Sequence, residues 1–539
     1  MTGRQFWLGA LVWLTAAIGL SALPATTLVD AARRQDRQAV RALLKQSVDV
    51  NTPAPDGSTA LHWAVQLDDA EMVDMLIGAG ADVKAVNRYG VAPLSIAAIN
   101  GSARILQQLL TAGAAPDTAM PEGETALMTI ARVGNVEALK LLVDRGANVN
   151  SRDGFRGQTA LMWAAARNNA DAVRLLVKAG ADVNARTNNA PRAATRLSES
   201  GNTFSAPPPT GFTPLLFAVR AGSIEAVRAL LDAGANVNDT LSDGESALVV
   251  AAANAHWQLA DILLDRGADP NLDGAGWNAL HQAVRERRPN IGFGTPGPIP
   301  TGTLDSINVI RKMIAKGVNL NARMQKNGMK DGQRNRLNRL GATAFFLAAK
   351  NTDTEVLKVL AEAKADATIP SADGTTPLMV AAGLAIWNPG EDGGSLMGQE
   401  DEVLEAVRMC VELGNDVNAA NISGETALQG AAFRGVNIVV QYLADQGATL
   451  DAKDSRGWTA LAIANGLTYT DFFKQQPQTA DLLTKLMKAK GLSTEGHAID
   501  PAVCFDCLQT RSDQARAVVE RDRKMEAEFA AHEQGTKSR

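Results

Sequence analysis

Apolar and polar positions follow the same order along most of the chain. Residues 123–156 show this order: GETALMTIARVGNVEALKLLVDRGANVNSRDGFR. A Gly-x-Thr-Ala-Leu segment opens the stretch, a Leu-Leu pair lies near its middle, and Gly-Ala-Asn-Val-Asn closes it. The pattern predicts two short helices whose apolar sides need a neighbouring unit to cover them, followed by a turn rich in Asp and Asn.

The side chains of this unit have clear structural roles. A Thr after the opening glycine can cap a helix, as predicted for Thr125, Thr159, Thr213, Thr426 and Thr459. Proline is tolerated directly after the cap. The second leucine-rich segment ends at a glycine suited to a helix C-terminus, at Gly80, Gly146, Gly180, Gly234 and Gly267.

The unit recurs at a nearly fixed spacing. Gly57, Gly90, Gly123 and Gly157 lie 33 or 34 residues apart, and the same spacing returns up to Gly457. This wording and period resemble the ankyrin repeat over residues 29–492, with eleven units from Gly57 and a partial, more polar one at 29–56. The resemblance implies a mainly α-helical ankyrin-repeat solenoid of about 11–12 repeats, with short β-hairpin fingers and several loop insertions. It also implies a surface that binds other macromolecules and is not an enzyme.

The first 25 residues differ from the repeats. Arg4 precedes an apolar run from Phe6 to Leu23, which predicts a secretory signal peptide cleaved near Ala22–Ala25. The run is nearly long enough to cross a bilayer, so an uncleaved N-terminal anchor is the alternative. In either case we expect an exported protein of bacterial type, periplasmic or secreted.

Interruptions of the repeat are informative because the repeat itself sets the expectation. Two insertions lengthen fingers, within 187–210 and 323–340, and three lengthen the turns between helices, at 289–303, 384–401 and 467–477. The second finger insertion is a candidate binding loop for an acidic or anionic partner, because it combines one acidic residue, Asp331, with six basic ones. A solvated loop is the alternative. The basic residues are Arg323, Lys326, Lys330, Arg334, Arg336 and Arg339.

In the ankyrin family, contact residues usually flank the finger glycines and follow the Ala-Ala pairs. The resemblance therefore implies a concave binding face in which aromatic and arginine side chains are candidate contacts. These residues are Tyr89, Phe155, Arg156, Phe212, Trp277, Phe433 and Trp458.

Composition and motifs indicate no chemistry within the repeats. The net charge of −5 argues against nucleic acid as the general partner. We find no catalytic, cofactor or metal motif, His62 and His281 are expected to make structural hydrogen bonds, and Cys410 is expected in the core. Residues 493–539 hold Cys504-Phe-Asp-Cys507, interpreted as a disulfide in an oxidising compartment, followed by a charged helix with a thin apolar stripe.

The sequence thus predicts a monomeric, non-enzymatic scaffold for a protein partner, without nucleic-acid binding and with membrane contact only through an uncleaved N-terminus. The alternative is a redox-active accessory protein in which Cys504 and Cys507 act on a client held by the repeats.

Overall fold

The computed structural model describes residues 27–188, 210–288, 299–327, 337–385, 400–466 and 475–495, together with helical positions between 524 and 531. The chain packs as two compact units. The first comprises residues up to 130 with 140–147, and the second comprises 131–139 and residues from 148 onward.

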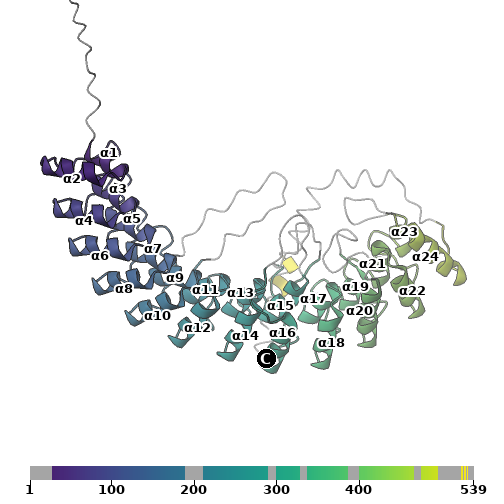
Figure 1. Ribbon diagram of the computed structural model, residues 1–539. Coiled ribbons are helices and arrows are strands. Elements are labelled where there is room, and N and C mark those ends of the chain that lie inside the picture. Colours follow the sequence, from purple (N-terminus) through teal and green to yellow (C-terminus); the bar gives the residue numbers. More distant parts are fainter. Residues whose placement is uncertain are drawn as a thin grey trace, which may run out of the picture. The chain divides into compact units, whose positions relative to one another are not determined.

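Short helices follow one another in pairs, a first and a second helix in each repeat (Figure 1). In the first unit these are α1 (Leu28–Arg33), α2 (Arg37–Lys45), α3 (Ala60–Gln66), α4 (Ala70–Gly78), α5 (Pro93–Asn100) and α6 (Ala103–Thr111). The residues of α7 (Ala126–Val133) and α8 (Val136–Asp144) are divided between the two units.

The second unit continues the same pairing. Its helices are α9 (Ala160–Ala166), α10 (Ala170–Lys178), α11 (Pro214–Arg220), α12 (Ile224–Asp232), α13 (Ala247–Ala253), α14 (Trp257–Asp265), α15 (Ala279–Arg287), α16 (Ser306–Ala315), α17 (Ala344–Lys350), α18 (Thr354–Glu362), α19 (Pro377–Ala382), α20 (Glu400–Glu412), α21 (Ala427–Arg434), α22 (Asn437–Asp445), α23 (Ala460–Ala464) and α24 (Pro477–Ala489). The described residues therefore hold twelve pairs, which confirms the predicted repeat number.

Helix boundaries confirm the roles expected for threonine and glycine. The hydroxyl oxygens of Thr159, Thr213 and Thr459 accept hydrogen bonds from backbone N–H groups in the first turns of α9, α11 and α23. Gly180 and Gly234, which follow α10 and α12, have φ values of +89° and +86°. This left-handed conformation ends the helix without the steric penalty that a Cβ would add.

The core lies between neighbouring pairs. In the second unit each first helix packs on the first helix of the next repeat, as α11 does on α9 and α13, and most second helices pack on the next second helix, as α10 does on α12. Leu230 of α12 is fully buried between its neighbours, as the Leu-Leu pattern predicts. Every repeat therefore depends on the adjacent ones for burial of its apolar face.

The fingers, defined as the segments between the second helix of one repeat and the first helix of the next, are tight turns. Within the described residues, bridge pairing is limited to two isolated antiparallel pairs, Ala119 with Thr125 and Thr240 with Ser246. In several fingers an Asn or Asp side chain closes the turn: Oδ1 of Asp454 accepts from the N–H groups of Arg456 (2.9 Å) and Trp458 (2.8 Å). The fingers are thus hairpin-shaped but too short to form regular strands.

The last Asn of the repeat, which was predicted only as a turn residue, connects neighbouring repeats. The Asn418 side chain donates to the carbonyl of Gly447 (3.1 Å) and accepts from the N–H of Thr449 (2.8 Å). Asn150 makes the equivalent pair of bonds to Gly180 and Asp182. These amides satisfy backbone groups at the end of the next repeat's second helix, where helical partners are missing.

An ion-pair network surrounds the end of α15, where an insertion separates it from α16. The Asp353 carboxylate, 0% exposed, accepts from Arg287 Nε at 2.6 Å and lies 3.8 Å from Arg288 Nε. Arg287 also pairs with Glu355, and Arg288 pairs with Glu402 of α20. The network around this buried carboxylate therefore connects three successive repeats, the third through the pair of Arg288 with Glu402.

No described helix is long and apolar enough to cross a membrane. The predicted signal peptide at 1–25 lies outside the described residues, and the proposed boundaries at 29 and 492 remain predictions.

Candidate protein-interaction face

The finger tips of the second unit display side chains from a rigid backbone. Oδ1 of Asp153 accepts hydrogen bonds from the N–H groups of Phe155 (3.1 Å), Arg156 (2.7 Å) and Gly157 (3.0 Å). This arrangement leaves the Phe155 ring 73% exposed, with the Arg156 guanidinium 5.4 Å from its centroid. An exposed aromatic–cation pair on a fixed turn is a typical protein contact, because little conformational entropy is lost on binding.

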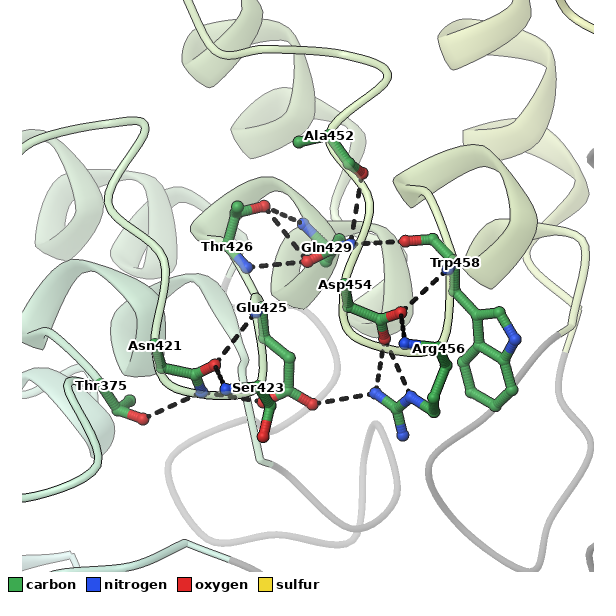
Figure 2. Close-up of polar contacts among 10 residues, drawn as sticks. All are labelled: Thr375, Asn421, Ser423, Glu425, Thr426, Gln429, Ala452, Asp454, Arg456 and Trp458. Atoms are coloured by element: carbon green, nitrogen blue, oxygen red, sulfur yellow. Dashed lines mark hydrogen bonds and ion pairs between the residues drawn. The ribbon is translucent and has the colours of Figure 1, made fainter.

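Two neighbouring fingers near the end of the second unit form a polar cluster (Figure 2). Arg456 reaches from its own finger to Glu425 on the preceding one, with Nη2 and Oε1 3.0 Å apart, and it also pairs with the buried Asp454 at 2.6 Å. Its guanidinium lies 4.4 Å from the ring centroid of Trp458. The arginine is therefore held in place between two carboxylates and an indole ring.

Asn421 and Gln429 make further hydrogen bonds that hold the same cluster in place. The Asn421 amide donates to Glu425 Oε2 (2.8 Å) and to Thr375 Oγ1 (3.2 Å), so Glu425 is fixed on both of its oxygens (Figure 2). Gln429 Nε2 donates to the carbonyl of Trp458 at 2.8 Å. These bonds position Arg456 and the half-buried Trp458 as a preorganised contact pair.

The central part of the finger face is more deeply packed. Phe212 is only 6% exposed, because its ring lies 5.0 Å from that of Phe217 and is covered by Arg220 at 5.3 Å. Burial raises the pKa of the Glu245 carboxyl, as does Asp243 to a lesser degree, while Arg220 and Arg285 oppose the shift. Here Arg220 covers the Phe212 ring, which belongs to the core.

The predicted contact residues differ in their exposure to solvent. Tyr89 in the first unit and Phe155 in the second are 70% and 73% exposed, while Trp277 and Trp458 are half-buried. Phe212 and Phe433, at 6% and 4%, are core residues, which corrects their assignment as contacts. The side chains that precede a finger glycine, Tyr89 and Phe155, are thus exposed, whereas those that directly follow one, Phe212, Trp277 and Trp458, are buried or half-buried.

The basic residues of the predicted loop also divide into those that pack on the fold and those that are exposed. Arg323 donates to the carbonyls of Gly341 and Pro370, both at 3.0 Å, and Arg339 is only 3% exposed. Both therefore contribute to the fold, and Arg339 does not belong to an exposed basic surface. Lys326 is exposed, and Lys330, Arg334 and Arg336 lie outside the described residues.

An arginine fixes the base of each finger insertion. Before the first insertion, Arg186 donates to the carbonyls of Gly211 and Thr240, both at 2.9 Å, and pairs with Asp239. Beside it, Thr187 and Phe212 join the two ends of the loop by two hydrogen bonds. This role of Arg186 was not predicted, although the same three residues, Asn-Ala-Arg, occur at 184–186 and 321–323 and mark both positions.

The remaining candidates for chemistry are structural where they are described. His62 Nε2 donates to the carbonyl of Val91 at 3.1 Å, and His281 Nε2 to that of Ala322 at 3.0 Å, which confirms their predicted structural role. Cys410 is buried as a free thiol, and burial raises its pKa to about 12. Cys504 and Cys507 lie outside the described residues.

Comparison with known proteins relates these repeats to others. A family model described as ankyrin repeats (3 copies) matches residues 11–87, 94–187 and 215–292, and a second, ankyrin repeats (many copies), matches 162–231. The Notch-regulated ankyrin repeat-containing protein of Homo sapiens is 36% identical over 86 residues, which make up 15% of this chain and 75% of that protein.

Longer proteins match over part of their length. The nuclear factor NF-kappa-B p105 subunit of Gallus gallus is 32% identical over 176 residues, 32% of this chain, and the chain spans only 15% of that protein. Among solved structures, the human ASB11 ankyrin repeat domain aligns with 25% identity and a TM-score of 0.37, over 45% of this chain and 98% of that one.

Proposed function

Since the chain belongs to the ankyrin-repeat family, we propose that it is a non-enzymatic scaffold whose finger face binds a protein partner. The observation that carries the proposal is the row of fixed finger tips in the second unit. Phe155 with Arg156 and Trp458 with Arg456 each place an aromatic ring and a cation on a turn that its own Asp holds rigid.

The mixture of charges favours a folded protein over a uniformly charged polymer as the partner. Arg456 is balanced by Glu425 and Asp454, and Arg220 lies close to Glu245. A face whose charges alternate selects a partner by the complementary arrangement of its own charges.

Replacing Phe155 and Arg156 together with serine is expected to reduce capture of the native partner at least tenfold, because truncating an aromatic anchor and its cation commonly costs 2 kcal/mol or more, about thirtyfold. The immobilised full chain would be incubated with the envelope fraction of its source cells, and captured proteins quantified by mass spectrometry.

A matched control is Arg174→Ser on α10, an exposed arginine on a second helix that pairs with Asp171 three positions earlier. This variant should retain full capture, and both variants should keep the wild-type thermal unfolding curve. Equal capture by the wild type and the finger variant would contradict binding at this face.

The site of action is proposed to be outside the cytoplasm, on the basis of the apolar run from Phe6 to Leu23. We expect the mature protein from its native host to begin near Ala22–Ala25, and intact-mass measurement would show this. An unprocessed N-terminus in the membrane fraction would favour an uncleaved anchor, and an unprocessed chain in the cytosol would refute export.

The redox alternative depends on Cys504 and Cys507. We expect exported protein to hold this pair as a stable intramolecular disulfide, because CxxC cysteines in an oxidising compartment readily pair. Peptide mapping of alkylated, unreduced protein would reveal the bond. A pair that exchanges rapidly with glutathione would favour the redox function, and two free thiols would refute the disulfide.

A further inference from the structure

The end of the chain contributes a helix with one covered side, which we call the tail helix (yellow in Figure 1). Met525 and Phe529, one turn apart, are half-buried. The other described positions are exposed, and the ion pair between Lys524 and Glu528 lies on that side, with side chains 78% and 69% exposed. The thin apolar stripe predicted for this segment is therefore in contact with another part of the second unit.

The surface that receives Phe529 lies at the base of the second finger insertion. The Arg323 guanidinium is 4.8 Å from the Phe529 ring centroid, and its Nε and Nη2 atoms are bonded to the carbonyls of Gly341 and Pro370. The cation is thus already in position for a ring to stack on it.

Gly341 gives the ring the space it needs. A Cβ at this position would lie 2.6 Å from Nη2 of Arg323 and 3.1 Å from both Cε2 of Phe529 and the backbone nitrogen of Ala372, and the φ value of +76° also disfavours other residues. A side chain here would therefore displace the Arg323 guanidinium on which the ring stacks and would also crowd the ring itself.

The second contact point is Asn338, which is 5% exposed. Its Nδ2 donates to Sδ of Met525 at 3.1 Å, and its Oδ1 accepts from the N–H of Leu340 at 3.0 Å, which fixes the orientation of the amide. A thioether is a weak acceptor, so this contact favours methionine by shape and polarisability.

We propose that Arg323, Asn338 and Gly341 form a docking site for an amphipathic helix that carries a methionine and an aromatic residue one turn apart, and that the tail helix occupies this site as an internal ligand. Tethering provides an effective concentration in the millimolar range, so a few contacts suffice to keep the site covered. A partner helix with the same two side chains binds by displacing the tail. This role for an external helix rests on the proposed scaffold function, whereas docking of the tail does not.

Disulfide trapping tests the internal contact. In a full-length Cys504→Ser/Cys507→Ser background, Asn338→Cys with Met525→Cys should cross-link under mild oxidation at least tenfold faster than Asn338→Cys with Lys524→Cys, whose second position faces away. The expected product is a cross-linked monomer on a non-reducing gel. A cross-linked dimer, or equal rates for the two pairs, would overturn docking of the tail on its own chain.

A labelled peptide of residues 515–539 tests whether the site accepts a helix from outside. The peptide should bind the full-length Met525→Ser/Phe529→Ser variant at least tenfold more tightly than the wild type, whose site is occupied. The Lys524→Ala peptide should bind as well as the original, and the Phe529→Ser peptide should not bind.

Absence of peptide binding to the tail variant would overturn the docking site. It would leave capture through Phe155 and Arg156 unaffected, so the failure of this proposal is distinguishable from the failure of the scaffold function.

Discussion

Replacing Asp353 with alanine is expected to lower the free energy of unfolding of the second unit by about 3–5 kcal/mol, the usual cost of removing one partner from a buried ion pair. The variant leaves Arg287 and Arg288, which are 18% and 27% exposed, without their shared carboxylate. It also removes the N-cap of α18, because Asp353 accepts from the N–H of Val356. Urea unfolding followed by circular dichroism would measure the loss.

Glu355→Ala provides the matched control, because Glu355 pairs with the same Arg287 but is 55% exposed. Exposed pairs contribute about 1 kcal/mol or less, so this variant should unfold close to the wild type. Similar losses for Asp353→Ala and Glu355→Ala would show that burial of the carboxylate is not what stabilises these repeats.

Lowering the pH from 7 to 4 is expected to remove about 3 kcal/mol of stability through His281 alone. Burial lowers the pKa of this imidazole from 6.5 to about 4, so the unfolded chain takes up a proton before the folded one does. The contribution is fully present above pH 6.5 and is lost as the pH falls towards 4. Urea midpoints measured at half-unit intervals across this range would reveal it.

Carboxylates also titrate in this range, so the test is a comparison with His281→Gln. Glutamine already occupies the equivalent position at Gln429, where it accepts from the N–H of Thr426 and donates to the carbonyl of Trp458. The variant should keep both bonds and show a shallower loss of stability between pH 6.5 and 4.5. Parallel curves for wild type and variant would refute the contribution of His281.

The local structure of the repeats follows from their own residues. The Thr caps, the terminal glycines and the buried Leu230 depend on neighbours within one unit or its copies, so periodicity predicts them well. The burial of Arg339 could not be predicted in this way, because it depends on how a finger folds back after an insertion whose sequence is not repeated elsewhere in the chain.

Contacts between residues far apart in the sequence could likewise not be predicted from the repeat pattern. Arg287 and Asp353 are 66 positions apart, and Asn338 and Met525 are 187 apart. Each pair joins an interruption of the repeat to another segment, and the period gives no information where it is broken. Within the predicted face, Phe155 lies two positions before its finger glycine and is exposed, whereas Phe212 directly follows one and is buried, a difference that was lost when both were grouped as residues flanking the glycine.

The arginine-fixed bases of the finger insertions have a consequence for protein engineering. Thr187 and Phe212 are joined by two hydrogen bonds, and Arg186 ties the same point to the next finger. An inserted segment between Thr187 and Phe212 begins and ends at two residues that are hydrogen-bonded to each other. Its length should therefore not alter the spacing of the helices on either side. We therefore expect that a foreign epitope, a fluorescent reporter or a second binding module grafted into 189–209 is tolerated and leaves the packing of the repeats unchanged.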